Sequence, residues 1–125
     1  MREPDQAPSE IKLHRKSRSL ELVYPDGEAF RLPCEYLRVF SPSAEVQGHG
    51  PGQGVLLVGK EKANIKEIEP VGNYAVRLIF EDGHNSGIYS WDYLRYLGER
   101  QEENWANYLA RLEEVGYKRK PVEDE

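Results

Sequence analysis

The 125-residue sequence has a single cysteine and lacks any apolar run near the roughly 18 residues that mark a membrane-spanning helix. One cysteine excludes both an intramolecular disulfide and a cysteine-rich metal site. The first 20 residues contain no apolar core of the kind found in signal peptides. We therefore predict a cytoplasmic protein without a membrane segment, in a reducing compartment where a lone thiol persists.

An excess of positive charge is also lacking. The chain has 17 Lys and Arg against 22 Asp and Glu, a net charge of −5, and its pI is about 5.3. These values argue against a general binder of nucleic acids or anionic membranes. The excess lies entirely in residues 81–125, which hold 6 basic and 11 acidic side chains. We interpret this region as a solvated acidic helix and tail, and steering toward a basic partner is the alternative.

The distribution of apolar residues predicts one domain with polar ends. A length of 125 residues is typical of a single domain with one core. Apolar residues are scarce at both ends, where the chain cannot bury enough surface to offset the entropy of ordering. We predict a disordered N-terminal tail over residues 1–10, one domain over 11–116 and a charged tail over 117–125.

Apolar and polar residues alternate in several segments of the first half, which predicts strands. The strands fall at about residues 11–13, 20–24 and 28–32, and Pro25-Asp26-Gly27 is the turn between the last two. Pro33 suits the first turn of a helix, so we expect a short helix from Cys34 to about Phe40.

The second half shows the same types of element. We expect strands over 55–58, 65–71, 74–80 and 87–89. Ser90 is a favourable N-cap for a helix that begins at Trp91, continues to about Leu97 and ends at Gly98. Apolar residues at helical spacing then predict an amphipathic helix from about residue 102 to 115.

A repeated pattern relates the two halves. Each half reads strand, Asp-Gly turn, strand and short helix with Tyr-Leu-Arg, at Asp26-Gly27 and 36–38 and again at Asp82-Gly83 and 93–95. Both pieces are common in proteins, so chance is the competing explanation. A genuine repeat implies two similar units packed with approximate symmetry, in which each Tyr and Leu faces the core and each Arg lies at the surface or pairs with a carboxylate.

These elements together predict an α+β fold. We expect a small, mostly antiparallel sheet built from two hairpin-helix units, followed by a C-terminal amphipathic helix.

Soft metal ligands are few and widely spaced. They are His14, Cys34, His49 and His84, and none stands at Cys-x-x-Cys or His-x-x-x-His spacing. A surface position is the default for each histidine. Cys34 follows Pro33 at a helix start, where a thiol can become reactive, but we favour a small packed side chain there. We predict no cofactor.

The segment 41–54 contains four Gly and two Pro, which rules out a helix or a strand interior. It does not end in Gly-Lys-Ser or Gly-Lys-Thr, so it is not a phosphate-binding loop. We interpret it as a mobile interaction loop. Asp82, His84 and Ser86 resemble a nucleophilic triad in composition only, since a tight turn gives them no reason to converge.

Three segments form a recognisable set: LRVFSPSAEVQGHG at 37–50, VGNYAV at 71–76 and FEDGHNSGIYSWDYL at 80–94. Together they resemble the gamma-butyrobetaine hydroxylase-like N-terminal domain family. The resemblance covers about residues 11–98. Members of this family are standalone proteins of unknown function or domains of larger chains. Two such chains are gamma-butyrobetaine and trimethyllysine dioxygenases, which carry the domain at the N-terminus, and some Mrp-type iron–sulfur carrier P-loop ATPases, which carry it at the end.

The resemblance also implies that a zinc site found elsewhere in the family is lost in this chain. In the dioxygenases this domain carries no catalytic residue and holds a structural zinc through three Cys and one His. The matching positions here are Ser41, Ser43, Val46 and His84. Hydroxyl groups and a valine do not replace zinc-binding thiolates. We therefore expect no metal, with His84 as the remaining ligand position, and no enzymatic activity.

The resulting hypothesis is a non-catalytic interaction or accessory module. Its expected partner is a protein, an iron–sulfur carrier P-loop ATPase or an oxygenase-type enzyme, rather than a nucleic acid or a membrane. The candidate partner-binding residues are Arg38, Ser41, Ser43, Gln47, His49, Asp82, His84 and Trp91. The alternative hypothesis is a metal-binding protein that uses His84 with His49 or Cys34.

Overall fold

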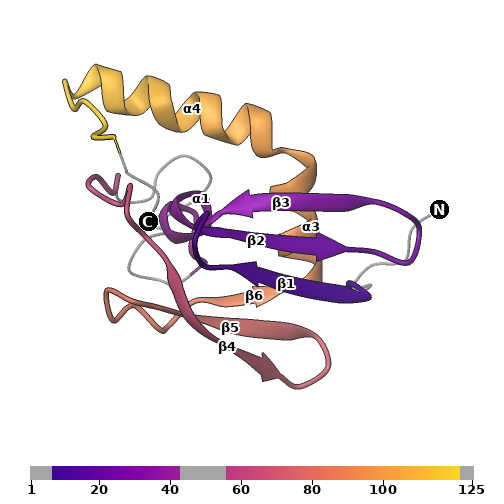
Figure 1. Cartoon of the computed structure of the whole chain (residues 1–125). Coiled ribbons are helices and arrows are strands. Elements are labelled where there is room, and N and C mark those ends of the chain that lie inside the picture. Colours follow the sequence, from indigo (N-terminus) through magenta and orange to yellow (C-terminus); the bar gives the residue numbers. More distant parts are fainter. Residues whose placement is uncertain (1–6, 43–55, 122–125) are drawn as a thin grey trace.

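The first unit of the fold is a three-stranded antiparallel sheet followed by a helix. The computed structural model describes residues 7–42 and 56–121. In this part β1 (Glu10–His14), β2 (Ser19–Val23) and β3 (Ala29–Pro33) pair in the order β1-β2-β3, and α1 (Cys34–Val39) follows directly (Figure 1). The hairpin expected at Asp26-Gly27 thus joins β2 to β3.

The second unit repeats this order. Its strands are β4 (Ile65–Val71), β5 (Ala75–Phe80) and β6 (Ile88–Ser90), again antiparallel in the order β4-β5-β6, and α3 (Trp91–Glu99) follows. The last helix is α4 (Gln101–Glu114). The α+β fold is confirmed, with the described strands forming two sheets instead of one.

The two Asp-Gly turns have the same local geometry. In each turn an Asp Oδ1 accepts a backbone N–H two residues later, at 3.0 Å from Glu28 to Asp26 and at 3.0 Å from His84 to Asp82. The glycines that follow have φ of +92° and +94°, a conformation that residues with a Cβ rarely adopt. The sequence repeat is therefore matched by a structural repeat.

Two tyrosines hold the units together in a crossed arrangement. Tyr36 of α1 donates its hydroxyl proton to the carbonyl of Leu97 at 2.7 Å, and Tyr93 of α3 donates to the carbonyl of Phe40. Each tyrosine therefore caps the end of the other unit's helix region. Both hydroxyls lie at the junction between the units. Replacing either tyrosine with phenylalanine would therefore remove a hydrogen bond between the units.

Two arginines cross in the same sense. Arg38 of α1 pairs with Asp82 in the turn of the second unit, and Arg95 of α3 pairs with Asp26 in the turn of the first. The distances are 2.9 Å and 3.2 Å. The sequence left two alternatives for these arginines, a surface position or an ion pair with a carboxylate. The structure shows the ion pair.

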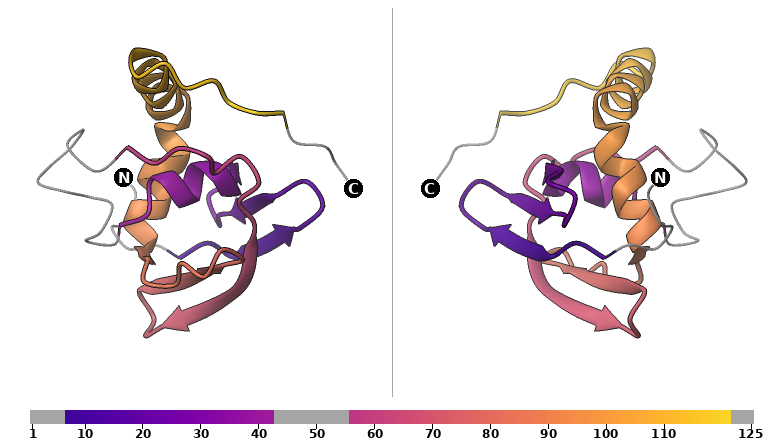
Figure 2. Two further views of the ribbon diagram at one scale, coloured as in Figure 1. Left: turned by 90° about the vertical axis from the view of Figure 1, so that its left-hand side faces the viewer. Right: turned by 90° about the vertical axis from the view of Figure 1, so that its right-hand side faces the viewer.

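The core lies between the two sheets and the helices. In Figure 1 and Figure 2, α4 and the β4-β5-β6 sheet occupy opposite ends of the molecule, with α1 and the first sheet between them. Full burial of a leucine or phenylalanine stabilises the fold by about 1.5–3 kcal/mol. The largest apolar contributors are Leu20, Leu22, Leu32, Leu37, Ile65, Leu78, Phe80, Leu94 and Leu97.

Two local expectations were wrong. Gly98 does not end the helix, because α3 continues to Glu99, and a Cβ at Gly98 would lie 2.5 Å from Cγ of Phe30. The glycine is thus a site of close packing. The strand expected over 55–58 is not formed by residues 56–58; the carbonyl of Leu57 instead accepts a hydrogen bond from Tyr108 of α4.

Both ends of the described chain make contacts. Strand β1 already begins at Glu10, the last residue of the expected N-terminal tail. Past α4, Tyr117 and the backbone of Lys120 donate to Glu61, and Arg119 pairs with Glu35. The charged segment after residue 116 is therefore held against the domain as far as Lys120. Among the described residues, each helix is too short or too polar to cross a bilayer.

Candidate functional site

Four of the candidate residues meet beside the β5–β6 turn. Helix α1 supplies Arg38, the segment directly after α1 supplies Ser41, and the turn supplies Asp82 and His84. They come from sequence positions more than 40 residues apart. The crossed packing of the two units places the end of α1 against the turn of the second sheet.

Asp82 lies at the centre of this cluster. Its Oδ2 accepts hydrogen bonds from Nε of Arg38 at 2.9 Å and Nζ of Lys60 at 3.2 Å, and its Oδ1 accepts the backbone N–H of His84. Partial burial raises the pKa of this carboxyl group, but the hydrogen bonds from His84, Arg38 and Lys60 outweigh it and lower the pKa to about 2. Asp82 is therefore ionised at neutral pH.

Ser41 and His84 form the buried part of the cluster. Oγ of Ser41 lies 2.9 Å from Nε2 of His84, and the two residues are 1% and 9% exposed. Gly87 allows this contact, because a Cβ at that position would lie 2.5 Å from Oγ of Ser41. A hydroxyl and an imidazole thus bond to each other inside the fold.

The arrangement brings together two positions that the family resemblance assigns to zinc. Ser41 and His84 are neighbours, whereas Ser43 and Val46 lie outside the described residues. A serine hydroxyl is a poor substitute for a thiolate, and within residues 7–42 and 56–121 no three His, Cys, Asp or Glu residues gather in a metal-binding group. The donor set seen there does not fit a structural zinc ion.

Cys34 does not supply a better ligand. It is fully buried, and its Sγ lies 3.8 Å from Oδ1 of Asn64. Burial raises the pKa of the thiol to about 11, so it stays protonated at neutral pH, and metals bind the thiolate. The prediction that Cys34 is a small packed side chain, rather than a reactive thiol, agrees with this burial. His49, the other ligand of the alternative hypothesis, lies outside the described residues.

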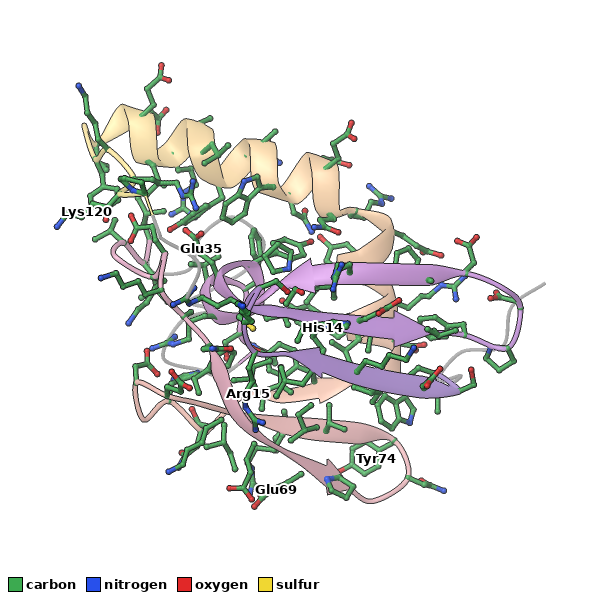
Figure 3. All side chains as sticks on the ribbon, viewed as in Figure 1. His14, Arg15, Glu35, Glu69, Tyr74 and Lys120 are labelled. Atoms are coloured by element: carbon green, nitrogen blue, oxygen red, sulfur yellow. The ribbon has the colours of Figure 1, made fainter. Side chains whose placement is uncertain are left out.

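Trp91 is not part of the cluster. It is buried at the start of α3, where its Nε1–H donates to the carbonyl of Asn73 at 2.8 Å and its backbone N–H donates to that of Tyr74. Tyr74 is in the β4–β5 turn, labelled in Figure 3, and this turn lies at the opposite end of β5 from Asp82. Trp91 therefore packs within the fold. Gln47, like Ser43 and His49, falls outside the described residues.

Sequence reasoning missed Lys60 and Gly87. Nothing in the sequence marks Lys60 as part of the cluster, since lysines are common in polar loops. Gly87 stands just before an expected strand, where an isolated glycine often marks a close backbone approach, so that signal was present. The exposed residues beside the cluster are Glu81, Asn85 and Ser86, which form the outer surface of the turn.

The low pKa of Asp82 predicts a defined acid sensitivity. Its ionised form stabilises the fold fully above its ordinary pKa of 3.8, and that stabilisation is lost as the pH falls from about 4 to about 2. Because the side chain is 37% exposed, we expect Asp82→Asn to cost only about 1 kcal/mol of the free energy of unfolding at pH 7. Urea unfolding at pH 7, 4 and 3 measures both the cost of Asp82→Asn at pH 7 and the loss of the Asp82 stabilisation in acid.

The control is Glu69→Gln, which removes a carboxylate from the exposed ion pair with Arg77. The difference in stability between wild type and Asp82→Asn should shrink from pH 4 to pH 3, while the Glu69→Gln variant should follow the wild type. A constant difference at all three pH values would contradict the assignment.

The chain is similar to one family model and to several solved structures. The model of the gamma-butyrobetaine hydroxylase-like, N-terminal family matches residues 11–95. Two NMR solution structures of proteins are 49% and 48% identical, each with a TM-score of 0.79, and their alignments cover 100% and 95% of this chain and 95% and 94% of those chains. No curated protein matches the chain.

A third similar structure is a crystal structure from Acidithiobacillus ferrooxidans. That protein has unknown function and belongs to the DUF971 family. It is 41% identical with a TM-score of 0.64, over 78% of this chain and 98% of that one.

Proposed function

The chain belongs to the gamma-butyrobetaine hydroxylase-like N-terminal family, and from that premise we propose that it is a non-catalytic interaction module that binds a protein partner. The observation that carries the proposal is the polar network of Arg38, Asp82, His84 and Ser41. Each polar side chain in it bonds to another member of the same network.

Such a network suits a scaffold better than a reaction centre. A general base or a nucleophile needs an atom that faces the substrate and exchanges a proton near neutral pH. Asp82 instead accepts three hydrogen bonds and has a pKa of about 2, and the Ser41 hydroxyl that bonds to Nε2 of His84 is only 1% exposed, so it does not face a substrate. These bonds fix the shape of the turn, and a rigid turn presents its outer groups to a partner at a low entropic cost.

The proposed contact surface is the exposed side of the β5–β6 turn. Glu81, Asn85 and Ser86 are exposed there, directly beside the network. Trp91 is excluded from this surface by its burial.

The proposed partner is an iron–sulfur carrier P-loop ATPase or an oxygenase-type enzyme in the cytoplasm. This choice rests on the larger chains in which domains of this family occur, which is an argument by analogy.

Site-specific photo-crosslinking in native cells tests the surface. We expect a photoreactive phenylalanine analogue at Asn85 to give one recurrent crosslinked partner, identified by mass spectrometry and lost when unlabelled wild-type protein competes. The matched control places the same analogue at Asn107, an exposed asparagine on α4. Equal crosslinking at both positions, or none at Asn85, would contradict the proposed surface.

A further inference from the structure

The hairpin turn between β1 and β2 is strongly basic. Three of its four residues are cations, in the order Arg15, Lys16, Ser17 and Arg18, although such turns usually favour Gly, Asn, Asp or Ser. Arg15 and Lys16 are exposed and Arg18 is partly exposed. In a chain with a net charge of −5, this is a local concentration of the minority charge.

The turn cations lack carboxylate partners. Lys12 and His14, just before the turn, pair with Glu10 and Glu21. By contrast, Arg15, Lys16 and Arg18 form no ion pair with any carboxylate in the described ranges, nor does Lys66 on the adjoining strand β4. Their positive charge is therefore not neutralised within that part of the fold.

Arg18 occupies a backbone conformation that favours glycine. Its φ is +54°, and every other residue with positive φ in the described ranges is a glycine. In the β4–β5 turn the same left-handed backbone conformation is adopted by a glycine, Gly72, with φ of +55°. The contact that Arg18 makes to α1 uses its backbone carbonyl, which accepts the N–H of Cys34 at 2.8 Å. Since any residue supplies that carbonyl, this bond does not require the arginine side chain, and strain of this kind often accompanies function.

The turn is also held in a fixed position. Nη2 of Arg15 donates to the carbonyl of Lys66 at 2.7 Å, and Nδ2 of Asn64 donates to the carbonyl of Arg15 at 3.0 Å. Figure 3 shows Arg15 reaching across to β4. These bonds tie the turn to the start of β4, next to Lys66. An open depression of about 370 Å³ is lined by residues 14–17.

The basic turn adjoins the proposed contact surface. The carbonyl of Asn64 accepts the backbone N–H of Glu81 at 3.0 Å, so Asn64 contacts both the β1–β2 turn and the start of the β5–β6 turn. Both turns lie on the same side of the molecule in Figure 1. A partner bound at the β5–β6 turn would therefore extend over the cations.

We propose that Arg15, Lys16, Arg18 and Lys66 form a docking site for a carboxylate-rich segment of a partner protein. This rests on the proposed function and names the chemistry of the partner. Guanidinium groups bind carboxylates with paired hydrogen bonds, and the fixed turn presents them without further ordering. The net charge of −5 opposes the extended negative field of a nucleic acid or a bilayer, whereas a short acidic segment meets only the local cations.

The test is an NMR titration of the full ¹⁵N-labelled chain with a capped octaglutamate peptide at low and moderate salt. The variant Lys16→Gln/Arg18→Gly removes two charges, keeps the Arg15–Lys66 bond and relieves the positive φ. The control Arg100→Gln/Lys118→Gln removes two exposed charges elsewhere. We expect shifts at residues 15–18 and Lys66, affinity about five-fold weaker in the turn variant and unchanged in the control, and weaker binding as salt rises.

Equal affinity of the two double variants would overturn the proposal, as would an absence of peptide binding or shifts confined to other residues. A single-stranded RNA or phosphatidylserine vesicles that bind the turn more tightly than the peptide in the same buffer would overturn the choice of partner class. Crosslinking at Asn85 is measured separately, so the proposed function can stand while this docking site fails.

Discussion

Replacing Arg95 with alanine is expected to lower the free energy of unfolding by about 3 kcal/mol. The side chain is only 7% exposed, with Nη2 at 3.2 Å from Asp26 and Nε at 3.0 Å from Glu99. Its guanidinium carbon lies 4.6 Å from the ring centre of Tyr24 and 5.4 Å from that of Phe30. The sum combines about 1–2 kcal/mol from the cation–π contacts with about 1–2 kcal/mol from the charged hydrogen bonds.

The matched control is Arg77→Ala, which deletes the same side chain from an exposed ion pair with Glu69. That variant should change stability by less than about 0.5 kcal/mol, since exposed pairs contribute little. A third variant, Arg95→Met, keeps the apolar stem and removes the buried Nη1, which has no hydrogen-bond partner. We expect it to lose about half as much as Arg95→Ala. Equal stability of Arg95→Ala and Arg77→Ala in urea unfolding would refute the role of the crossed pair.

Gly98→Ala is expected to destabilise the fold by about 1–2 kcal/mol, although alanine favours a helix interior by about 1 kcal/mol. The added Cβ would lie 2.5 Å, 2.7 Å and 2.8 Å from Cγ, Cδ2 and Cδ1 of Phe30. These atoms are near the backbone end of the ring, so the whole side chain must move, and overpacking of this kind costs about 1–3 kcal/mol. Thermal or urea unfolding measures the net change.

The sign of this effect should reverse when Phe30 is removed. In a Phe30→Ala background the clash is gone, and Gly98→Ala should then stabilise the protein by up to about 1 kcal/mol through helix propensity. Destabilisation of the same size in both backgrounds would show that Phe30 is not the obstacle.

The sequence was a good guide where the determining interactions are local. Alternation of apolar and polar residues predicted β2, β3 and β5, and the Asp-Gly pairs predicted both hairpin turns, since the side chain of each Asp bonds to the backbone two residues away. It failed at Gly98, because a glycine that ends a helix and a glycine that admits a neighbouring ring look the same in sequence. It failed at residues 56–58, since a short apolar run has no periodicity.

The candidate site was predicted residue by residue but not as an arrangement. Arg38, Ser41, Asp82 and His84 were all named, and the structure brings them together. Trp91 was assigned to the same surface because it follows the turn closely in sequence. An extended strand advances about 3.3 Å per residue, so β6 carries Trp91 to the far end of the sheet.

The sequence by itself determined the turns, the order of strands and helices, the excess of acidic groups near the C-terminus and the repeated Asp-Gly and Tyr-Leu-Arg pattern. Only the tertiary structure decided that Arg38 pairs with the second Asp and Arg95 with the first. Each arginine follows an aspartate of its own unit by 12 or 13 residues, and both pairings were open on sequence alone. The packing of each helix against the other unit's turn selects the crossed pairs, because it brings Arg38 to Asp82 and Arg95 to Asp26.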